Sequence, residues 1–316
     1  MPDSDKPAGD GSAPQPPGPQ PGPTGPLPET LSTGRARAPG KWGDLGTRLV
    51  SAFVMLAITL AALWSGGAFW TLLVMAVSAL MGWELARLCA PGIAPTRSVP
   101  LAVSFIVPLA ILAMPFLSGA DMDAVYRAQV LSWAAMLVPL LLGLVLLSGP
   151  LLSPAKLIWL GYGAIIAFGG QYFLFTGLDP WGLVWLLAVV AIVMISDVLG
   201  YFAGRLIGGP KFWPRISPKK TWSGTVAGWL GAALFGAVVI PRFVTGEQGP
   251  NPLGMAAIAV LVAFAGQMGD IAASAIKRRV GVKDASNLIP GHGGFMDRLD
   301  AMVAAGAVTN IWLLML

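Results

Sequence analysis

Charged side chains and glycines are concentrated in residues 274–300 of this chain. The charged members are Lys277, Arg278, Arg279, Lys283, Arg298, Asp284, Asp297 and Asp300, and the only histidine of the chain, His292, lies among them. Paired carboxylates can hold Mg²⁺ against phosphate oxygens, while Lys and Arg neutralise the remaining charge. Glycines at 291, 293 and 294 would let backbone N–H groups approach a phosphate. The stretch therefore predicts a phosphoryl-transfer site, and the alternative is a solvated basic loop.

Two further carboxylates lie in apolar segments that end in basic residues. Asp270 lies seven residues before Lys277, roughly 10 Å of helix, and Asp197 lies eight before Arg205, roughly 12 Å. Because a carboxylate inside a membrane is costly, two at similar depth predict a polar cavity. The alternative is that each makes an interhelical hydrogen bond. Glu84 is a third such acid, and the sequence leaves its role open between structure and function.

A basic connection precedes another apolar segment. Ser217, Lys219, Lys220 and Thr221 would lie at the amino terminus of the helix that follows, where N–H groups and the helix dipole attract anions. They are predicted to bind an anionic substrate, and the alternative is a basic loop with a helix cap.

These residues resemble the signature of the phosphatidate cytidylyltransferase (CDP-diacylglycerol synthase) family. Its fixed positions are met by Ser274, Lys277, Arg278, Lys283, Asp284, Pro290, His292, Gly293, Gly294, Asp297, Arg298 and Asp300. Residues 195–205 and 214–224 resemble two other recurring elements of that family. One departure is Ala273, which stands where the family usually has Glu, and the sequence leaves its effect open.

The resemblance implies that CTP and phosphatidic acid react to CDP-diacylglycerol and pyrophosphate with Mg²⁺, and it leaves a second cation open. The residues expected to be catalytic are Asp270, Asp297, Lys277 and Asp284. Those expected to bind substrate are Ser217, Lys219, Lys220, Thr221, Arg278, Lys283, His292 and Arg298. Those expected to hold metal are Asp270, Asp297, Asp300 and Asp197.

Composition predicts an all-α polytopic membrane protein, because the chain is 55% hydrophobic with a mean hydropathy of +0.72. About nine transmembrane helices are expected, at 49–66, 68–88, 98–118, 130–148, 157–177, 180–207, 223–245, 252–276 and 300–316. Residues 1–48 are predicted to form a disordered, Pro/Gly-rich cytoplasmic tail. Residues 49–177 would form the amino-terminal transmembrane helices, and 178–316 the carboxyl-terminal catalytic region.

Charge bias gives an orientation. With nine helices and a cytoplasmic amino terminus, every Lys and Arg except Arg127 and Arg242 lies on the cytoplasmic side. The catalytic cavity is therefore expected at that side, with membrane lipid and nucleotide phosphates, not nucleic acid, as partners. The family type, and the lack of an organelle-targeting peptide, indicate the inner (cytoplasmic) membrane of a bacterium. The oligomeric state stays open, including a homodimer.

Three other functions are weighed against this one. A CTP-dependent lipid kinase of the polyprenol or phytol type would share the membrane and nucleotide requirements but release CDP. A CDP-alcohol phosphotransferase would need an Asp-Gly-x2-Ala-Arg…Gly…Asp-x3-Asp run, which the sequence lacks. A transporter would also bury Asp and Gly in helices, but the sequence has no inverted repeat and its polar residues gather on one side.

Overall fold

The structure is a computed structural model that describes residues 41–243 and 251–313. The predicted disordered tail therefore lies outside the described residues up to position 40. The helices are α1 (Lys41–Ser65), α2 (Gly67–Cys89), α3 (Pro95–Ser104), α4 (Ile106–Ser118), α5 (Met122–Ala135), α6 (Leu137–Leu146), α7 (Pro154–Leu178), α8 (Gly182–Leu206), α9 (Trp222–Val238), α10 (Ile240–Phe243), α11 (Pro252–Arg279) and α12 (Met296–Leu313). Two short strands, β1 (Lys211–Trp213) and β2 (Ser217–Thr221), pair in an antiparallel hairpin.

Eight helical segments of the described chain are long and apolar enough to cross a membrane. The pairs α3–α4 and α5–α6 each supply one span, and α9 with α10 supplies another. The predicted all-α, multi-pass membrane architecture is confirmed in these elements. The ninth predicted span corresponds to α12, which does not meet the same criteria, because Asp297, Arg298 and Asp300 lie in its first turns.

Several predicted boundaries are wrong. The first helix begins at Lys41, within the segment predicted as tail. The fourth span begins at Met122, not 130, because Asp121 caps α5 by accepting the Ala124 N–H at 2.8 Å. Arg127, predicted to lie in an outer loop, consequently lies within α5. The hairpin was not predicted, because strands of three and five residues are too short to show a clear alternation.

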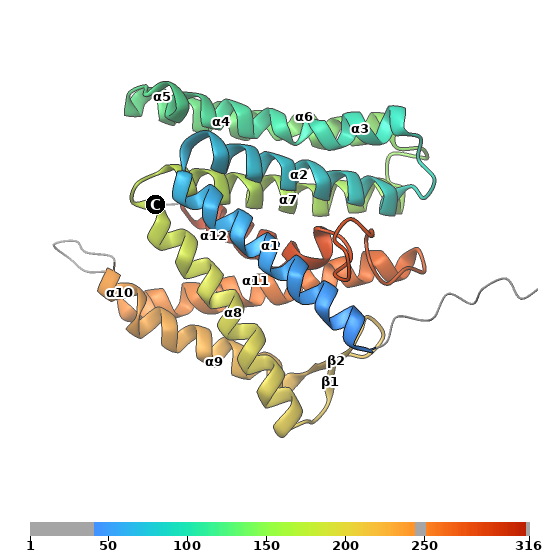
Figure 1. Ribbon diagram of the computed structural model, residues 1–316, viewed down its shortest axis with the longest axis vertical. Coiled ribbons are helices and arrows are strands. Elements are labelled where there is room, and N and C mark those ends of the chain that lie inside the picture. Colours follow the sequence, from blue (N-terminus) through green and yellow to red (C-terminus); the bar gives the residue numbers. More distant parts are fainter. Residues whose placement is uncertain (1–40, 244–250, 314–316) are drawn as a thin grey trace, which may run out of the picture. The chain divides into compact units, whose positions relative to one another are not determined.

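The helices pack in layers (Figure 1). Helices α3 to α6 lie on one side of α2 and α7, while α8, α9, α11 and α12 lie on the other. Helix α7 packs against both α2 and α12, so it connects the amino-terminal helices with the carboxyl-terminal ones. Glycines permit this packing: a Cβ on Gly169 would lie 2.4 Å from the Val303 carbonyl oxygen, and one on Gly269 would lie 2.5 Å from that of Asp300.

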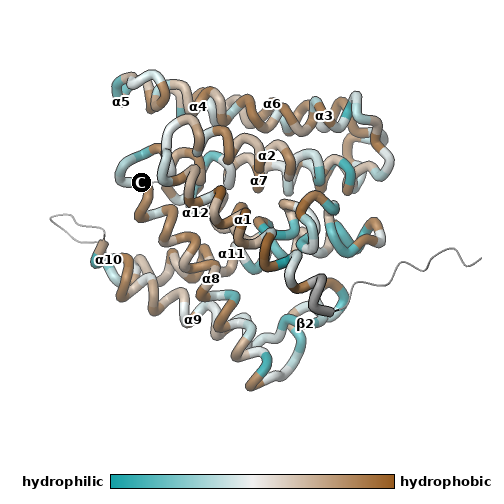
Figure 2. Tube along the Cα trace, viewed as in Figure 1, coloured by the Kyte–Doolittle hydropathy of each residue, from teal (hydrophilic) through white to brown (hydrophobic). Residues whose placement is uncertain are grey.

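Two hydrophilic stretches lie toward one end of the helices (Figure 2). The hairpin and the connection from α11 to α12 are both polar and lie toward the same end, whereas the middles of the spans are hydrophobic. Because α11 runs directly into the polar connection, its last turns bring Asp270 and Lys277 to this end. The fold thus gathers most of the chemically interesting residues in one region.

Candidate active site

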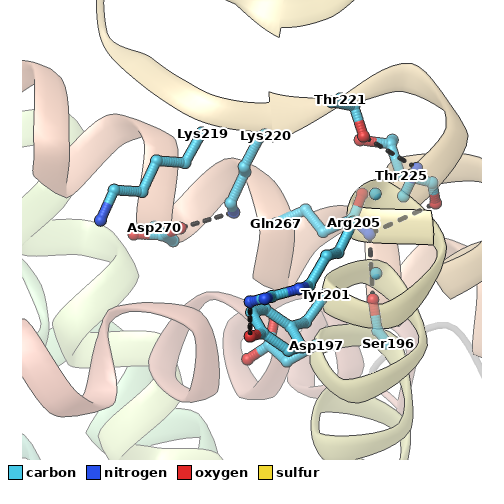
Figure 3. Close-up of a pocket in the computed structure, with 13 residues that line it drawn as sticks. Ser196, Asp197, Tyr201, Arg205, Lys219, Lys220, Thr221, Thr225, Gln267 and Asp270 are labelled. Carbon is cyan, nitrogen blue, oxygen red and sulfur yellow. Dashed lines mark hydrogen bonds and ion pairs between the residues drawn. The ribbon is translucent and has the colours of Figure 1, made fainter. Parts of the chain in front are cut away.

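A cavity of about 510 Å³ lies between α8, β2, the start of α9 and α11 (Figure 3). A cavity of this volume falls in the range typical of small-molecule sites. Its lining residues are Ser196, Asp197, Gly200, Tyr201, Gly204, Arg205, Lys219, Lys220, Thr221, Gly224, Thr225, Gln267 and Asp270. The structure therefore brings Asp197 and Asp270, from two different helices, into one cavity.

The charges in the cavity are partly paired. Lys220 Nζ lies 2.5 Å from Asp270 Oδ2, and both side chains keep access to solvent. Asp197 lies within electrostatic range of both Lys220 and Asp270, and so does Asp300 from α12. Lys219 extends beside Asp270 (Figure 3) and forms no ion pair among the described residues. The cavity therefore combines acidic groups with a free ammonium group.

Local interactions hold the cavity walls together. Gln267 donates to Ser196 Oγ at 3.0 Å and to the Thr225 carbonyl at 3.4 Å, which ties α11 to α8 and α9. Thr221 caps α9, because its hydroxyl accepts the Gly224 N–H at 3.3 Å. The helix cap of the alternative interpretation is therefore present, and the Thr221 hydroxyl both caps α9 and lines the cavity. The predicted binding of an anion by these residues stays a prediction.

A second polar cluster forms around Asp297, at the start of α12. Asp297 Oδ1 lies 2.5 Å from Lys277 Nζ, and Oδ2 accepts N–H groups from Ala285 at 2.7 Å and Gly294 at 2.9 Å. Gly293 has a φ of +89°, and a Cβ there would lie 2.8 Å from Asp297 Oδ2. Asp297 therefore holds the connection between α11 and α12 in place through these contacts.

Glu84 closes the same connection from α2. It accepts the Ser286 hydroxyl at 2.6 Å and the N–H groups of Phe295 at 3.0 Å and Met296 at 2.7 Å. A Cβ on Gly294 would lie 2.3 Å from Glu84 Oε1, so glycine is needed for this approach. The question that the sequence left open has a structural answer: Glu84 caps the amino terminus of α12 from another helix.

The histidine turn is anchored to α1. The Ser51 hydroxyl lies 2.8 Å from His292 Nδ1 and 2.9 Å from the Pro290 carbonyl oxygen. Arg298 donates to the His292 carbonyl through Nε at 2.9 Å and Nη2 at 2.6 Å. Both side chains that sequence reasoning assigned to substrate thus take part in fixing the turn.

The predicted site residues fall into two sets. Asp197, Lys219, Lys220, Thr221 and Asp270 line the cavity, and Asp300 lies within electrostatic range of it. Those outside its lining are Ser217, Lys277, Arg278, Lys283, Asp284, His292, Asp297 and Arg298. The family signature at residues 274–300 therefore contributes no residue to the cavity lining. It begins in the last turns of α11, the helix whose Gln267 and Asp270 do line the cavity.

Sequence reasoning did not assign the cavity residues Tyr201, Arg205 and Gln267 to the site. Arg205 Nη1 donates to the Tyr201 hydroxyl at 3.0 Å. Helical spacing could have indicated these residues. Tyr201 follows Asp197 by four residues and Arg205 follows Tyr201 by four, while Gln267 precedes Asp270 by three. Residues at these spacings lie on the same face of a helix.

The cavity carboxylates suit a hard cation. Mg²⁺ prefers oxygen ligands and commonly uses one or two carboxylates, with substrate phosphates completing its coordination. No three His, Cys, Asp or Glu side chains in the described chain converge as a complete metal site. Asp270, with Asp197 and Asp300 near it, fits a site in which one or two carboxylates and the substrate phosphates together coordinate Mg²⁺. Both oxygens of Asp297 already have protein partners, and its role as a metal ligand stays a prediction.

Comparisons with known proteins agree with the resemblance in the sequence. A family model described as "Cytidylyltransferase family" matches residues 46–316. A protein named phosphatidate cytidylyltransferase from Brucella abortus biovar 1 (strain 9-941) is 33% identical over 85% of this chain and 93% of its own length. Proteins of the same name from Pseudomonas aeruginosa and Staphylococcus haemolyticus are 34% and 31% identical, covering 83% and 84% of this chain and 94% and 98% of their own lengths. The chain therefore belongs to the cytidylyltransferase family and is a nucleotidyltransferase enzyme.

Proposed function

We propose that this protein is a phosphatidate cytidylyltransferase, which converts CTP and phosphatidic acid to CDP-diacylglycerol and pyrophosphate. The observation that supports this most is the match to relatives of that name across nearly their whole length. The cavity adds support, because it holds carboxylates and ammonium groups at the polar end of membrane-spanning helices. Both a triphosphate and a lipid phosphate could be neutralised there.

The chain's own residues would bind and orient the phosphates. Lys219 has no ion pair within the described residues and would contact the triphosphate directly. Lys220 can exchange Asp270 for a phosphate oxygen, because their ion pair is partly exposed. Arg205 offers a planar guanidinium group at the cavity wall. Together these cations would hold the α-phosphorus of CTP against the lipid phosphate.

The reaction balances without a general base. An oxygen of the lipid phosphate, already an anion, attacks the α-phosphorus; the new P–O bond forms while the bond from that phosphorus to the β-phosphate oxygen breaks. Pyrophosphate leaves with the electron pair. Asp270, with Asp197 or Asp300, would hold Mg²⁺ together with the substrate phosphates, and the ion would supply charge neutralisation on the phosphate oxygens.

The setting that we propose is a bacterial inner membrane, with the amino terminus and the cavity on the cytoplasmic side. The support is the charge bias of the sequence, in which every Lys and Arg except Arg127 and Arg242 is expected on the cytoplasmic side. CTP would then enter from the cytoplasm, and phosphatidic acid from the surrounding lipid.

A turnover assay on purified protein tests the proposal. Phosphatidic acid, labelled CTP and Mg²⁺ should give a labelled lipid and pyrophosphate in equal amounts. Lys220→Met should reduce that turnover strongly, because it removes a cavity charge. Lys211→Met, a matched change on β1 outside the cavity lining, should not. Labelled CDP together with a phosphorylated lipid alcohol would instead establish a lipid kinase, and solute transport without chemistry would establish a transporter.

A further inference from the structure

Tyr162 on α7 is a buried tyrosine that no sequence motif marks. It is 3% exposed and belongs to an apolar cluster with residues from four other helices, including Leu85 of α2, Ala273 of α11 and Met296 of α12. The residue thus lies where the helix that carries Asp270 meets the helix that carries Asp300.

The hydroxyl of Tyr162 is buried without a hydrogen-bond partner in the described part of the chain. A buried hydroxyl left unpaired is costly, and a phenylalanine at this position would avoid the cost. Tyr172, on the same helix and equally buried, differs: its hydroxyl donates to the Trp185 carbonyl at 2.6 Å. Packing alone therefore accounts for the ring of Tyr162 but not for its oxygen.

Four carboxylates lie within electrostatic range of the Tyr162 hydroxyl, and they differ in their spare capacity to accept a hydrogen bond. Glu84 accepts three donors, and Asp297 has three partners. Asp270 is paired with Lys220. Among the described residues, Asp300 accepts a hydrogen bond only from the neighbouring Ala301 N–H, at 2.8 Å, which leaves its second oxygen for another donor.

We propose that Tyr162 is a positioning residue whose hydroxyl donates to the free oxygen of Asp300 and holds that carboxylate toward Asp270 when the site is loaded. The inference rests on the proposed function, in which Asp300 helps Asp270 to hold the cation on CTP. Hydrogen bonds at active sites are commonly long in the free enzyme and tighten in the substrate complex. That contact would give the unpaired hydroxyl its partner.

Tyr162→Phe removes the hydroxyl and keeps the ring. We expect an unfolding midpoint equal to or above that of the wild type, since a buried unpaired oxygen is lost. We expect kcat to fall by about 10- to 100-fold, as for the loss of a hydrogen bond to a charged group. Tyr172→Phe is the matched control, and it should show the reverse: a lower unfolding midpoint with kcat per folded enzyme nearly unchanged.

A double-mutant cycle with Asp300→Asn tests whether Tyr162 acts through Asp300. Tyr162→Phe should have little further effect on kcat in the Asp300→Asn background, because its partner is already altered. Full additivity, or turnover of Tyr162→Phe within about twofold of wild type at unchanged stability, would overturn the proposal.

A titration that needs no turnover separates this inference from the proposed function. The rise in unfolding midpoint with added Mg²⁺ should require several-fold more Mg²⁺ in Tyr162→Phe, and not in Tyr172→Phe. If the wild type makes no CDP-diacylglycerol, the proposed function fails, while this shift still decides the role of Tyr162. Identical Mg²⁺ curves for the wild type and Tyr162→Phe would refute that role.

Discussion

Two lysine–aspartate pairs, one in the cavity and one at the start of α12, differ in their access to solvent. Lys220 and Asp270, in the cavity, are 27% and 34% exposed, whereas Lys277 and Asp297, at the start of α12, are 9% and 4% exposed. Both pairs have the same 2.5 Å separation. Identical chemistry thus appears once in an open setting and once in a closed one.

The difference lies in the neighbouring donors. Asp297 has two backbone N–H groups besides its lysine, so its carboxylate is saturated. Asp270 has its lysine alone among the hydrogen-bond and ion-pair partners that the structure describes, with unfilled space next to it. A saturated buried pair fixes a loop, while an open pair can exchange a partner for a ligand. The comparison predicts that the Lys277–Asp297 pair mainly stabilises the connection between α11 and α12, and that the Lys220–Asp270 pair binds ligand.

The largest effect should follow from Asp270→Asn. We expect turnover to fall by about 100- to 1,000-fold, as for the loss of a principal electrostatic group. The unfolding midpoint should change little, because an exposed ion pair contributes about 1 kcal/mol or less. Kinetics and thermal unfolding on the same preparation measure both. Asp123→Asn, which changes an exposed acid on α5, is the control.

Asp297→Asn should act mainly on folding. Removing the charge leaves Lys277 buried without its counter-ion, and breaking a buried pair typically costs about 3–5 kcal/mol. Thermal unfolding should show the loss, and activity per folded molecule should fall much less than in Asp270→Asn. A stable but inactive Asp297→Asn would reverse the comparison and move the signature connection into the active site.

Glu84→Gln should destabilise the protein by about 1–3 kcal/mol, because an amide oxygen replaces a carboxylate that accepts three donors. Because Glu84 holds the connection between α11 and α12, the substitution should loosen that connection and make proteolytic cleavage within it faster. Unchanged cleavage with reduced turnover would show that Glu84 also touches the substrate.

Lys219→Met should give the smallest effect. This exposed lysine lines the open cavity, so the KM for CTP should rise about fivefold, the equivalent of roughly 1 kcal/mol, with kcat less affected. Lys211→Met in the same hairpin is the control. Equal KM values in the two variants would place the triphosphate elsewhere.

The sequence by itself determined the class of the protein. Long apolar segments must be helices in a membrane, because every backbone polar group needs an internal partner there. The stretch at 274–300 could also be recognised from the sequence, because it holds eight charged residues in a chain that is only 11% charged. The depths of Asp197 and Asp270 also follow from the helical rise alone.

The tertiary structure decided which of the acids are free. Asp270 and Asp297 have similar sequence surroundings, each close to glycines and followed by basic residues, so composition cannot tell them apart. Their difference comes from the N–H groups of Ala285 and Gly294, which the folded connection between α11 and α12 brings to Asp297. Glu84 of the distant helix α2 holds that connection through the Phe295 and Met296 N–H groups. Tyr162 was invisible for a related reason: a tyrosine in an apolar helix gains meaning only when the neighbouring helices place carboxylates around its hydroxyl.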